Sequence, residues 1–351
     1  MGDENLVEVR HFGARRRWGK RRRRMAALIC RMLVAGVASA AWLALSVGSA
    51  VAAEGGSSFY LLGQRSQGAG ILPPEGAFFS IPNYIYSGDA SGSKALEFGG
   101  SLAFGVDADL FITLPTAIWV TPVDVLGGDL ALAGTFVLGH ADVTATATLA
   151  IPGVGEGTAA LSDERWAVGD PAFSALVGWH AENFHTLVSA SVNVPVGDYE
   201  AGRLSNISLN RWAGDITGAA TWLNPKTGIE LSGAAGVTFN GENDETDYET
   251  GTEFHVEVAA VYHFSPAFSA GVNGYHYQQL SGDSGAGAAL GDFEGRVTAI
   301  GPVVSANFQL GPVPVVMSLR YFREFDAKNR LEGDAGWLTI SIPLWVPNQE
   351  N

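Results

Sequence analysis

The chain has 351 residues and a formal net charge of −15, with 47% hydrophobic residues and 45 glycines. The first 53 residues hold ten of the 21 Lys and Arg residues but three of the 36 Asp and Glu residues, so the remainder carries 11 basic and 33 acidic side chains. Such an acidic body repels nucleic acid and argues against that class of partner. The single cysteine, Cys30, lies in a segment that we expect to be removed, which leaves the mature protein without thiol chemistry.

The N-terminal segment, residues 1–53, has the layout of an export signal. A basic cluster from Arg15 to Arg24 precedes an apolar run from Met25 to Val51, which ends in small residues. This order predicts a secretory signal peptide cleaved after Ala52 or Ala53. The alternative is a single transmembrane anchor, but the small-residue ending and the lack of a later run of about 18 apolar residues favour cleavage. The sequence leaves open whether translation starts at Met1 or Met25.

The mature chain divides into a lead-in, a long strand-rich region and a short tail. Residues 54–74 are mixed in character, and we expect either a plug or a disordered segment there. Residues 75–346 contain fourteen candidate strands, and residues 347–351 form the tail. Because some neighbouring candidates can be single bent strands, we expect 12 to 14 strands and an even number. The candidates are 77–88, 97–107, 109–121, 129–138, 141–152, 164–180, 184–198, 209–222, 228–240, 252–264, 267–279, 294–310, 314–325 and 336–346.

The strands alternate apolar and polar side chains, which in an extended chain point to opposite faces. From Ile229, residues such as Leu231 and Val237 share one face, and Glu230 and Thr238 share the other. Charges along one whole face are atypical of a soluble sandwich and fit a wall with lipid outside and water inside. The pattern predicts an all-β fold: a closed antiparallel transmembrane β-barrel of the Gram-negative outer-membrane type.

The connections also fit a barrel in a membrane. Short turns at Asn224–Gly228 and Ser265-Pro266 contrast with longer polar loops at Asp244–Gly251 and Ser281–Gly291. Outer-membrane barrels have short turns on the periplasmic rim and long loops outside. Near the end of the last strand, Trp345 is placed to act as the aromatic residue that the outer-membrane assembly machinery recognises, with a short tail after it.

Seven polar residues are candidates for lining the lumen, although any wet lumen is polar whatever passes through it. Two of them, His255 and His263, are eight residues apart on one strand, or about 27 Å at about 3.4 Å per residue. A third histidine, His276, follows in the next strand, but His255 and His263 are too far apart to bind one ion without more distant ligands. We therefore predict no metal site and no cofactor. The seven candidates are Glu230, Glu253, His255, Glu257, His263, Asn273 and Arg320.

Two further groups were weighed as chemical sites. The acidic residues Glu242, Asp244, Glu245, Asp247 and Glu249 lack the glycine and closing glutamate of a calcium loop. We expect a solvated external loop, with a cation bridge to lipopolysaccharide phosphates as an alternative. A serine and a histidine near a strand end, Ser265 and His263, raise the possibility of a lipid-modifying enzyme, but no Gly-x-Ser-x-Gly elbow is present. We therefore predict that the protein is not an enzyme.

Several motifs in succession resemble the MetA-pathway of phenol degradation family. They are NVPVGDYEAG, the stretches 210–257 and 274–302, and RYFREFDAKNRLEG. The resemblance covers nearly all of residues 75–346 and is densest from 193 to 333. It implies an exported outer-membrane β-barrel without a catalytic motif.

The function that this resemblance implies is a channel for passive uptake or efflux of small hydrophobic or aromatic compounds. The expected partners are that solute, outer-membrane lipids and lipopolysaccharide, and the assembly machinery. Two alternatives remain open at this point. One is a structural or adhesive barrel without transport, and the other is a lipid-modifying barrel enzyme.

Overall fold

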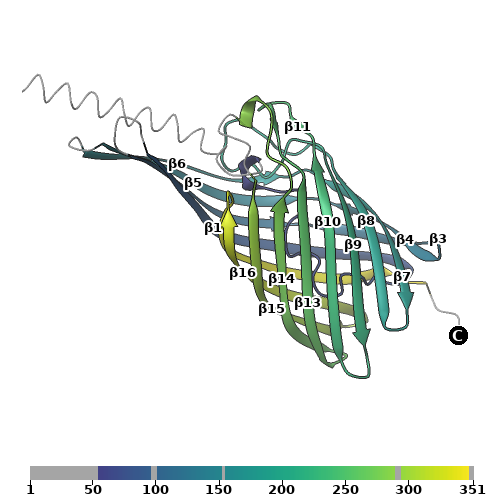
Figure 1. The fold of residues 1–351 in the computed structure, drawn as a ribbon. Helices are drawn as coiled ribbons and strands as arrows, with labels where there is room; N and C mark the ends of the chain where they lie inside the picture. The colour runs from purple at the N-terminus through teal and green to yellow at the C-terminus, as the bar shows by residue number, and fades with distance from the viewer. Residues whose placement is uncertain (1–53, 96–100, 152–154, 289–293, 348–351) are drawn as a thin grey trace, which may run out of the picture.

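The computed structural model describes residues 54–95, 101–151, 155–288 and 294–347, which form a closed antiparallel β-barrel with twelve strands in its wall (Figure 1). Closure joins the two ends of the described chain, because β17 (Glu332–Trp345) pairs with β1 (Gly76–Ala95). A closed wall leaves no edge strand facing lipid. The predicted fold is confirmed, and its strand number lies within the expected 12 to 14. The predicted export signal lies outside the described residues.

From β8 to β17, apart from β11 and β12, the strands run up and down the wall, each beside the next wall strand along the chain. Very short connections at 126–127, 182–183, 225–228, 266–267 and 311–312 lie at one rim, which we call the turn end. The connections 194–212 and 241–252 lie at the opposite rim, the loop end, as do the described parts of a third connection, 280–288 and 294–295. The strands are β8 (Phe184–Asn193), β9 (Ala213–Asn224), β10 (Ile229–Asn240), β13 (Glu253–Ser265), β14 (Phe268–Gln279), β15 (Arg296–Leu310) and β16 (Val313–Lys328). A small hairpin, β11 (Glu242–Asn243) and β12 (Tyr248–Glu249), lies in the acidic loop.

The first part of the chain builds longer strands, each split into two named pieces. The pieces nearer the turn end belong to the barrel wall: β3 (Thr116–Val125), β4 (Gly128–Thr135) and β7 (Ala172–Ala181). Of the other pieces, β2 (Ser101–Thr113) pairs with the far half of β1, β5 (Leu138–Ile151) pairs with β2, and β6 (Gly155–Val168) pairs with β5. They continue beyond the wall as a sheet, called here the extension, which projects to the upper left in Figure 1.

Prolines explain where the long strands break. Pro115 and Pro171 have no backbone N–H to donate to a ladder, so regular pairing stops beside them. The wall stays hydrogen-bonded there, because Phe136 N donates to Pro115 O (3.0 Å) and Gly169 N donates to Val137 O (2.9 Å). The predicted bounds differ at these points. We expected a break near residue 108, where the structure has it at 114–115, and the candidate 164–180 contains the break at 169–171.

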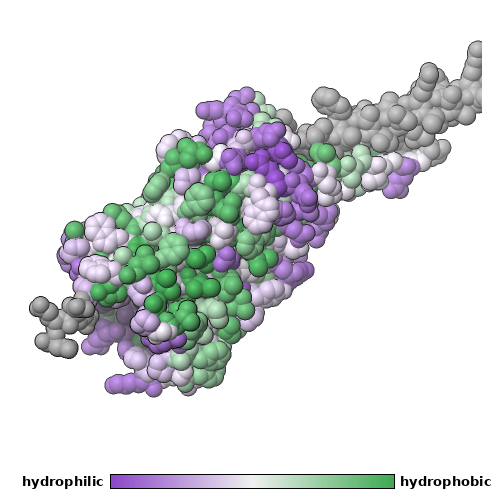
Figure 2. Space-filling model, turned by 180° about the vertical axis from the view of Figure 1, so that it is seen from behind, coloured by the Kyte–Doolittle hydropathy of each residue, from purple (hydrophilic) through white to green (hydrophobic). Residues whose placement is uncertain are grey.

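The barrel wall is polar inside and apolar outside. Along β10, Glu230 is 2% exposed whereas Leu231 is 52% exposed; along β13, Glu257 is 0% exposed and Val258 is 55% exposed. A water-soluble protein has the opposite distribution. Figure 2 shows hydrophobic residues spread over the wall, with hydrophilic residues gathered toward the ends. No helix among the described residues is long and apolar enough to cross a membrane.

The extension reverses this polarity. Val106 and Leu110 of β2 and Val143 of β5 pack toward the inside, whereas Asp107 and Asp109 of β2 are exposed on the outer face. Apolar-in and polar-out is the pattern of a sheet with one face in water. The alternation seen in residues 141–152 is therefore real, but its apolar face lines the interior and does not face lipid.

Candidate functional site

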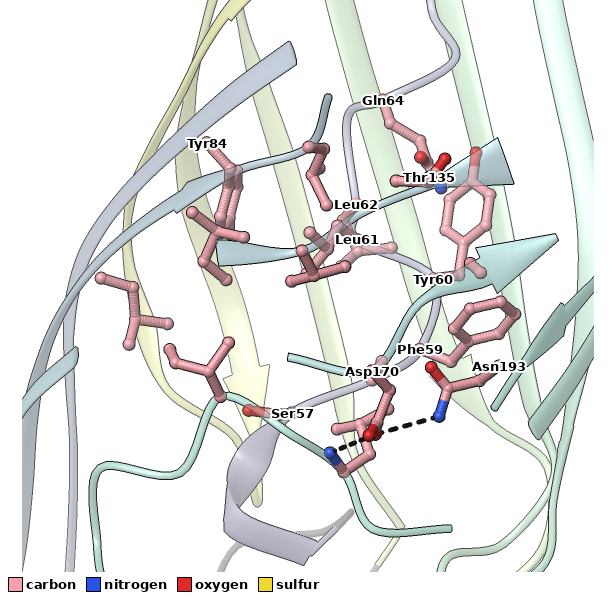
Figure 3. A pocket seen from close by; sticks show the side chains of 18 of the residues that line it. Ser57, Phe59, Tyr60, Leu61, Leu62, Gln64, Tyr84, Thr135, Asp170 and Asn193 are labelled. Atoms are coloured by element: carbon pink, nitrogen blue, oxygen red, sulfur yellow. Dashed lines mark hydrogen bonds between the residues drawn. The ribbon is translucent and has the colours of Figure 1, made fainter. Parts of the chain in front are cut away.

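The segment 54–75, called here the lumenal segment, passes through the barrel. At the loop end, the Glu54 carboxylate accepts hydrogen bonds from Asn243 Nδ2 (3.0 Å) and Thr246 Oγ1 (2.6 Å). Toward the turn end, Gly70 N donates to Thr221 Oγ1 (3.0 Å). The segment begins with a short 3-10 helix, η2 (Glu54–Gly56), and after it has no helix or strand. It lies between opposite walls, as Figure 3 shows for Phe59 to Leu62. Its backbone polar groups therefore need partners from the wall.

Glu257 of β13 supplies three of those partnerships. Its Oε1 accepts from Tyr60 Oη (3.0 Å) and from Gly63 N (2.9 Å), and its Oε2 accepts from Arg65 N (2.8 Å). A glycine is required at 63, because φ is +84° and an added Cβ would lie 2.5 Å from Phe322 Cε2. The carboxylate and the tight turn together fix the middle of the lumenal segment.

Two more carboxylates hold the segment on either side of this point. Glu230 of β10 accepts from Gly68 N (2.7 Å) and contacts His263 Nε2 (2.7 Å). Glu253 of β13 accepts from Ser58 Oγ (2.6 Å). Charge-assisted bonds of this kind are stronger than neutral ones, so three buried carboxylates form a row of anchors down one side of the lumen.

Arg320 of β16 complements these carboxylates by binding the segment's carbonyl groups. Its Nη1 donates to Gly63 O (2.8 Å) and Gln64 O (2.7 Å), while Trp337 Nε1 donates to Leu62 O (2.9 Å). A buried guanidinium near buried carboxylates offsets their charge, which would otherwise be costly to bury. The segment is therefore held through both its N–H and its C=O groups.

The remaining predicted lumen residues are inside the barrel with different surroundings. His255 stacks on Tyr60, with ring centroids 3.5 Å apart, and its Nε2 contacts Asp215 Oδ2 (2.9 Å). Asn273 is 2% exposed, and both of its side-chain polar atoms lack a hydrogen-bond partner. The structure thus brings Glu230, Glu253, His255, Glu257 and Arg320 into contact with the lumenal segment, whereas no hydrogen bond joins Asn273 to it. Whether these residues contact a solute stays a prediction.

A cavity of about 740 Å³ lies along the lumenal segment, on the side facing β1 to β8. The segment contributes Phe59, Leu61 and Leu62, and Figure 3 shows the last two pointing into it beside Tyr84. Barrel lumens of this size usually have polar walls. Here the wall opposite the segment is largely apolar, with contributions from Val106, Leu110, Ile112, Ile118, Val143 and Leu176.

Asp170 holds the connection 194–212 over the cavity at the loop end. Its carboxylate accepts five hydrogen bonds, from Ser208 Oγ (2.7 Å), Leu209 N (2.8 Å), Gly197 N (2.9 Å), Asn193 Nδ2 (3.1 Å) and Asn210 N (3.2 Å). The sequence analysis missed this residue. The signal was the Gly-Asp-Pro at 169–171, which interrupts a strand with a residue that favours local backbone hydrogen bonds.

Leu72 closes the cavity toward the turn end. Its Cβ lies 2.8 Å from where a Cβ on Gly178 would be, so the side chain sits directly on the backbone of β7. Ala131, Leu176 and Leu187 complete the buried apolar cluster around it. Leu72 and its apolar neighbours therefore form the boundary of the cavity toward the turn end.

The geometry of the described residues gives little support to a serine–histidine catalytic pair or to a metal site. His263 contacts Glu230, whereas Ser265 Oγ accepts from Ala267 N (3.2 Å), so the two side chains are engaged separately. Among the described residues, no group of three or more His, Cys, Asp or Glu side chains is placed to hold a metal ion. In the acidic loop, Asn243 and Thr246 bind Glu54 of the lumenal segment, which ties this loop to the interior.

The closed wall, apolar outside and threaded by its own N-terminal segment, defines the class as an outer-membrane-type β-barrel. The chain matches the model of the family described as MetA-pathway of phenol degradation over residues 88–340. It belongs to that family, which confirms the resemblance seen in the sequence. The sequence matches none of the curated proteins with which it was compared.

Solved structures with the same architecture include the COG4313 outer membrane channel from Pseudomonas putida F1. The likeness has a TM-score of 0.53 and 16% identity, and covers 81% of this chain and 99% of that chain. At this identity it shows the fold. The transport unit of the autotransporter AIDA-I from Escherichia coli is also similar, with a TM-score of 0.40 and 12% identity, over 83% of this chain and 95% of that chain.

Proposed function

We propose that the protein is an outer-membrane channel through which small hydrophobic or aromatic molecules diffuse down their gradient. One observation carries this proposal: the lumen contains a cavity of about 740 Å³ with a largely apolar wall. An apolar solute gains roughly 25 cal/mol for each Å² that leaves water, whereas a water-filled pore offers it no such gain. Membership of the family supports the same substrate class.

The route follows the cavity beside the lumenal segment. At the loop end, the inner face of the extension presents Val106 and Val143, and the connection 194–212 covers it with Ile207. A solute arriving from the lipopolysaccharide side meets this apolar surface first. It then passes Ile112 and reaches the Leu72 seal, so transport requires that Leu72 move aside. Nothing in this route needs a cofactor, and on this proposal the protein is not an enzyme.

The location and processing follow from the same proposal. Export would use residues 1–53 as a cleaved signal, with 54–74 as the plug, 75–346 as the barrel and 347–351 as the tail. The apolar wall would contact outer-membrane lipids, and Trp345, which ends β17, would be the residue recognised during assembly. Outer-membrane barrels commonly carry aromatic residues at the rims of their apolar band, which supports that placement.

The test is uptake by whole cells, because apolar solutes cross phospholipid bilayers unaided and are slowed by lipopolysaccharide. A strain lacking the gene receives the wild type, Ile112→Asp or the control Ile112→Val, and the initial uptake of 1-naphthol is measured. We expect wild type and Ile112→Val to restore uptake and Ile112→Asp to fail, because a carboxylate in the apolar cavity repels the solute. Equal uptake with wild type and empty vector would show that the barrel is structural. Heat-modifiable migration on a gel checks that each variant folds.

A further inference from the structure

Two histidines face each other at the turn end of the lumen, outside the machinery described above. His180 of β7 pairs directly with His185 of β8 across the hairpin whose turn is Glu182-Asn183. A hydrogen bond of 2.8 Å joins their Nδ1 atoms, with one ring as donor and the other as acceptor, and their ring centroids are 5.0 Å apart. A metal ion between the rings would replace this bond. Neither holds the lumenal segment through its side chain, and neither lines the cavity.

The separation of the two nitrogens suits one metal ion. Imidazole nitrogens bind zinc at about 2.0–2.1 Å, and two of them on a tetrahedral zinc ion lie about 3.3 Å apart. At similar bond lengths, two nitrogens in adjacent positions of a square-planar or tetragonal Cu²⁺ or Ni²⁺ site lie about 2.9 Å apart. The observed 2.8 Å requires only a small adjustment. Neutral histidine can carry its proton on Nε2, which frees both Nδ1 lone pairs for the ion.

The backbone that carries the pair is fixed on both sides. β7 pairs with β4 as far as Asp129–Gly178, and β8 pairs with β9, where His185 lies opposite Thr221. A two-residue turn closes the hairpin, with Glu182 at a φ of 47°. Ligands on paired strands of a closed wall need to order few torsions on binding, which favours affinity.

The pair is also accessible. Its neighbours one step further into the barrel are Gly178 and Leu187, next to the Leu72 seal, so the histidines lie at the rim. His180 is exposed and His185 half-buried. Asp129, paired with Gly178, places a carboxylate near the same rim, which favours cations there.

The other described histidines are committed elsewhere. His255 is buried and contacts Asp215, His263 contacts Glu230, and the His276 ring contacts Thr298 Oγ1 (2.8 Å). His140 packs on Trp166, with centroids 5.2 Å apart. Within the described part of the chain, His180 and His185 alone place two imidazole nitrogens at chelating distance.

We propose that His180 and His185 form a divalent transition-metal site at the turn end of the lumen, with water completing the coordination. Two imidazoles favour borderline metals over Mg²⁺ and Ca²⁺, and the order of affinity is Cu²⁺ above Ni²⁺ and Zn²⁺. The second histidine adds an intramolecular contact, which raises the affinity above that of a single histidine without new partners. This site is independent of the proposed transport.

Copper binding to the full-length gene product, purified in detergent without an affinity tag, tests the proposal. Cu²⁺ is titrated into the wild type, His180→Ala, His185→Ala and the control His276→Gln, and electron paramagnetic resonance reports the nitrogen ligands. We expect one Cu²⁺ with two nitrogen ligands in the wild type and in His276→Gln. Each substitution in the pair should weaken binding by roughly tenfold or more, because the chelate is lost.

Background binding by groups outside the pair is compared through His276→Gln, which keeps both His180 and His185. Wild-type affinity equal to that of His180→Ala and His185→Ala would overturn the proposal. A two-nitrogen signal that persists in both variants would do the same. Heat-modifiable migration of each variant excludes misfolding as the cause of a loss.

Discussion

Single carboxylates organise the inside of this barrel. Glu257 accepts three hydrogen bonds from the lumenal segment, and Asp170 fixes the connection 194–212 through its Ser208 and Leu209 groups. An acidic side chain has four lone-pair positions and no donor, so one residue can satisfy several backbone N–H groups of irregular chain. The excess of acidic residues in the mature sequence therefore has a structural use within the barrel, besides solvation of its loops.

Glu257→Ala should loosen the lumenal segment. It leaves the N–H groups of Gly63 and Arg65 and the Tyr60 hydroxyl without their acceptor, at roughly 1–3 kcal/mol for each group that stays buried and unpaired. The segment should then spend time away from the wall, and single-channel ion conductance in planar bilayers should rise. Glu156→Ala, at an exposed position of β6, is the control and should leave conductance unchanged. Unchanged conductance in Glu257→Ala would contradict the anchoring role.

Leu72→Ala should open the turn end. Removing this side chain takes away its packing on Gly178 and on the surrounding apolar cluster, and leaves a gap there. If the seal limits transport, 1-naphthol uptake by whole cells should increase severalfold over the wild type. Leu231→Ala is the matched control, because Leu231 is exposed on the outer face of the wall and lies outside both that cluster and the cavity. Equal uptake in both variants would place the limiting step elsewhere along the lumen.

At the scale of elements, the extension and the connection 194–212 form one unit at the loop end. Asp163 of β6 binds Arg203 (2.6 Å) and accepts a hydrogen bond from Ser205 Oγ (2.7 Å). Followed from strand to strand across the sheet, the residues paired with Asp163 reach β17 at Gly333, the second residue of that strand. Asp163 therefore lies at the loop end, beyond most of the barrel wall. The bonds also cover part of the outer edge of β6, which has no neighbouring strand among the described residues.

Acid should undock this unit before it unfolds the barrel. The hydrogen bond from Arg203, helped by Ser205, lowers the pKa of Asp163 to about 2 from its usual 3.8. A lowered pKa means that the stabilisation is complete above about pH 4 and is lost as the pH falls toward 2. Proteolysis of 194–212 by pepsin should accelerate over that range. Asp163→Asn should already show fast cleavage at pH 4, and cleavage at one rate in both proteins would refute the tether.

At the scale of the whole molecule, the sequence predicted the architecture because strand alternation is a local property. Glu230 beside Leu231 already indicates a wall with a polar and an apolar face. The interior was less predictable. The row of anchors and the cavity depend on which strands are neighbours and in what register, because residues far apart in sequence, such as Gly63 and Glu257, meet there. The His180–His185 pair depends on the register of a single hairpin. The reversed polarity of the extension was also hidden, since alternation does not state which face points inward.

The membrane-facing wall makes a depth-dependent prediction. Val258 lies at the middle of β13 and is 55% exposed, whereas Tyr262 lies nearer the turn end on the same outward face and is 47% exposed. An arginine on the lipid face of an outer-membrane barrel costs about 2–4 kcal/mol at the bilayer midplane and about 0–1 kcal/mol near the interface. Val258→Arg should therefore destabilise the barrel far more than Tyr262→Arg, as measured by reversible unfolding in guanidinium with lipid vesicles present. In a protein whose wall faced water, the two substitutions would have similarly small effects, and that outcome would refute the transmembrane assignment.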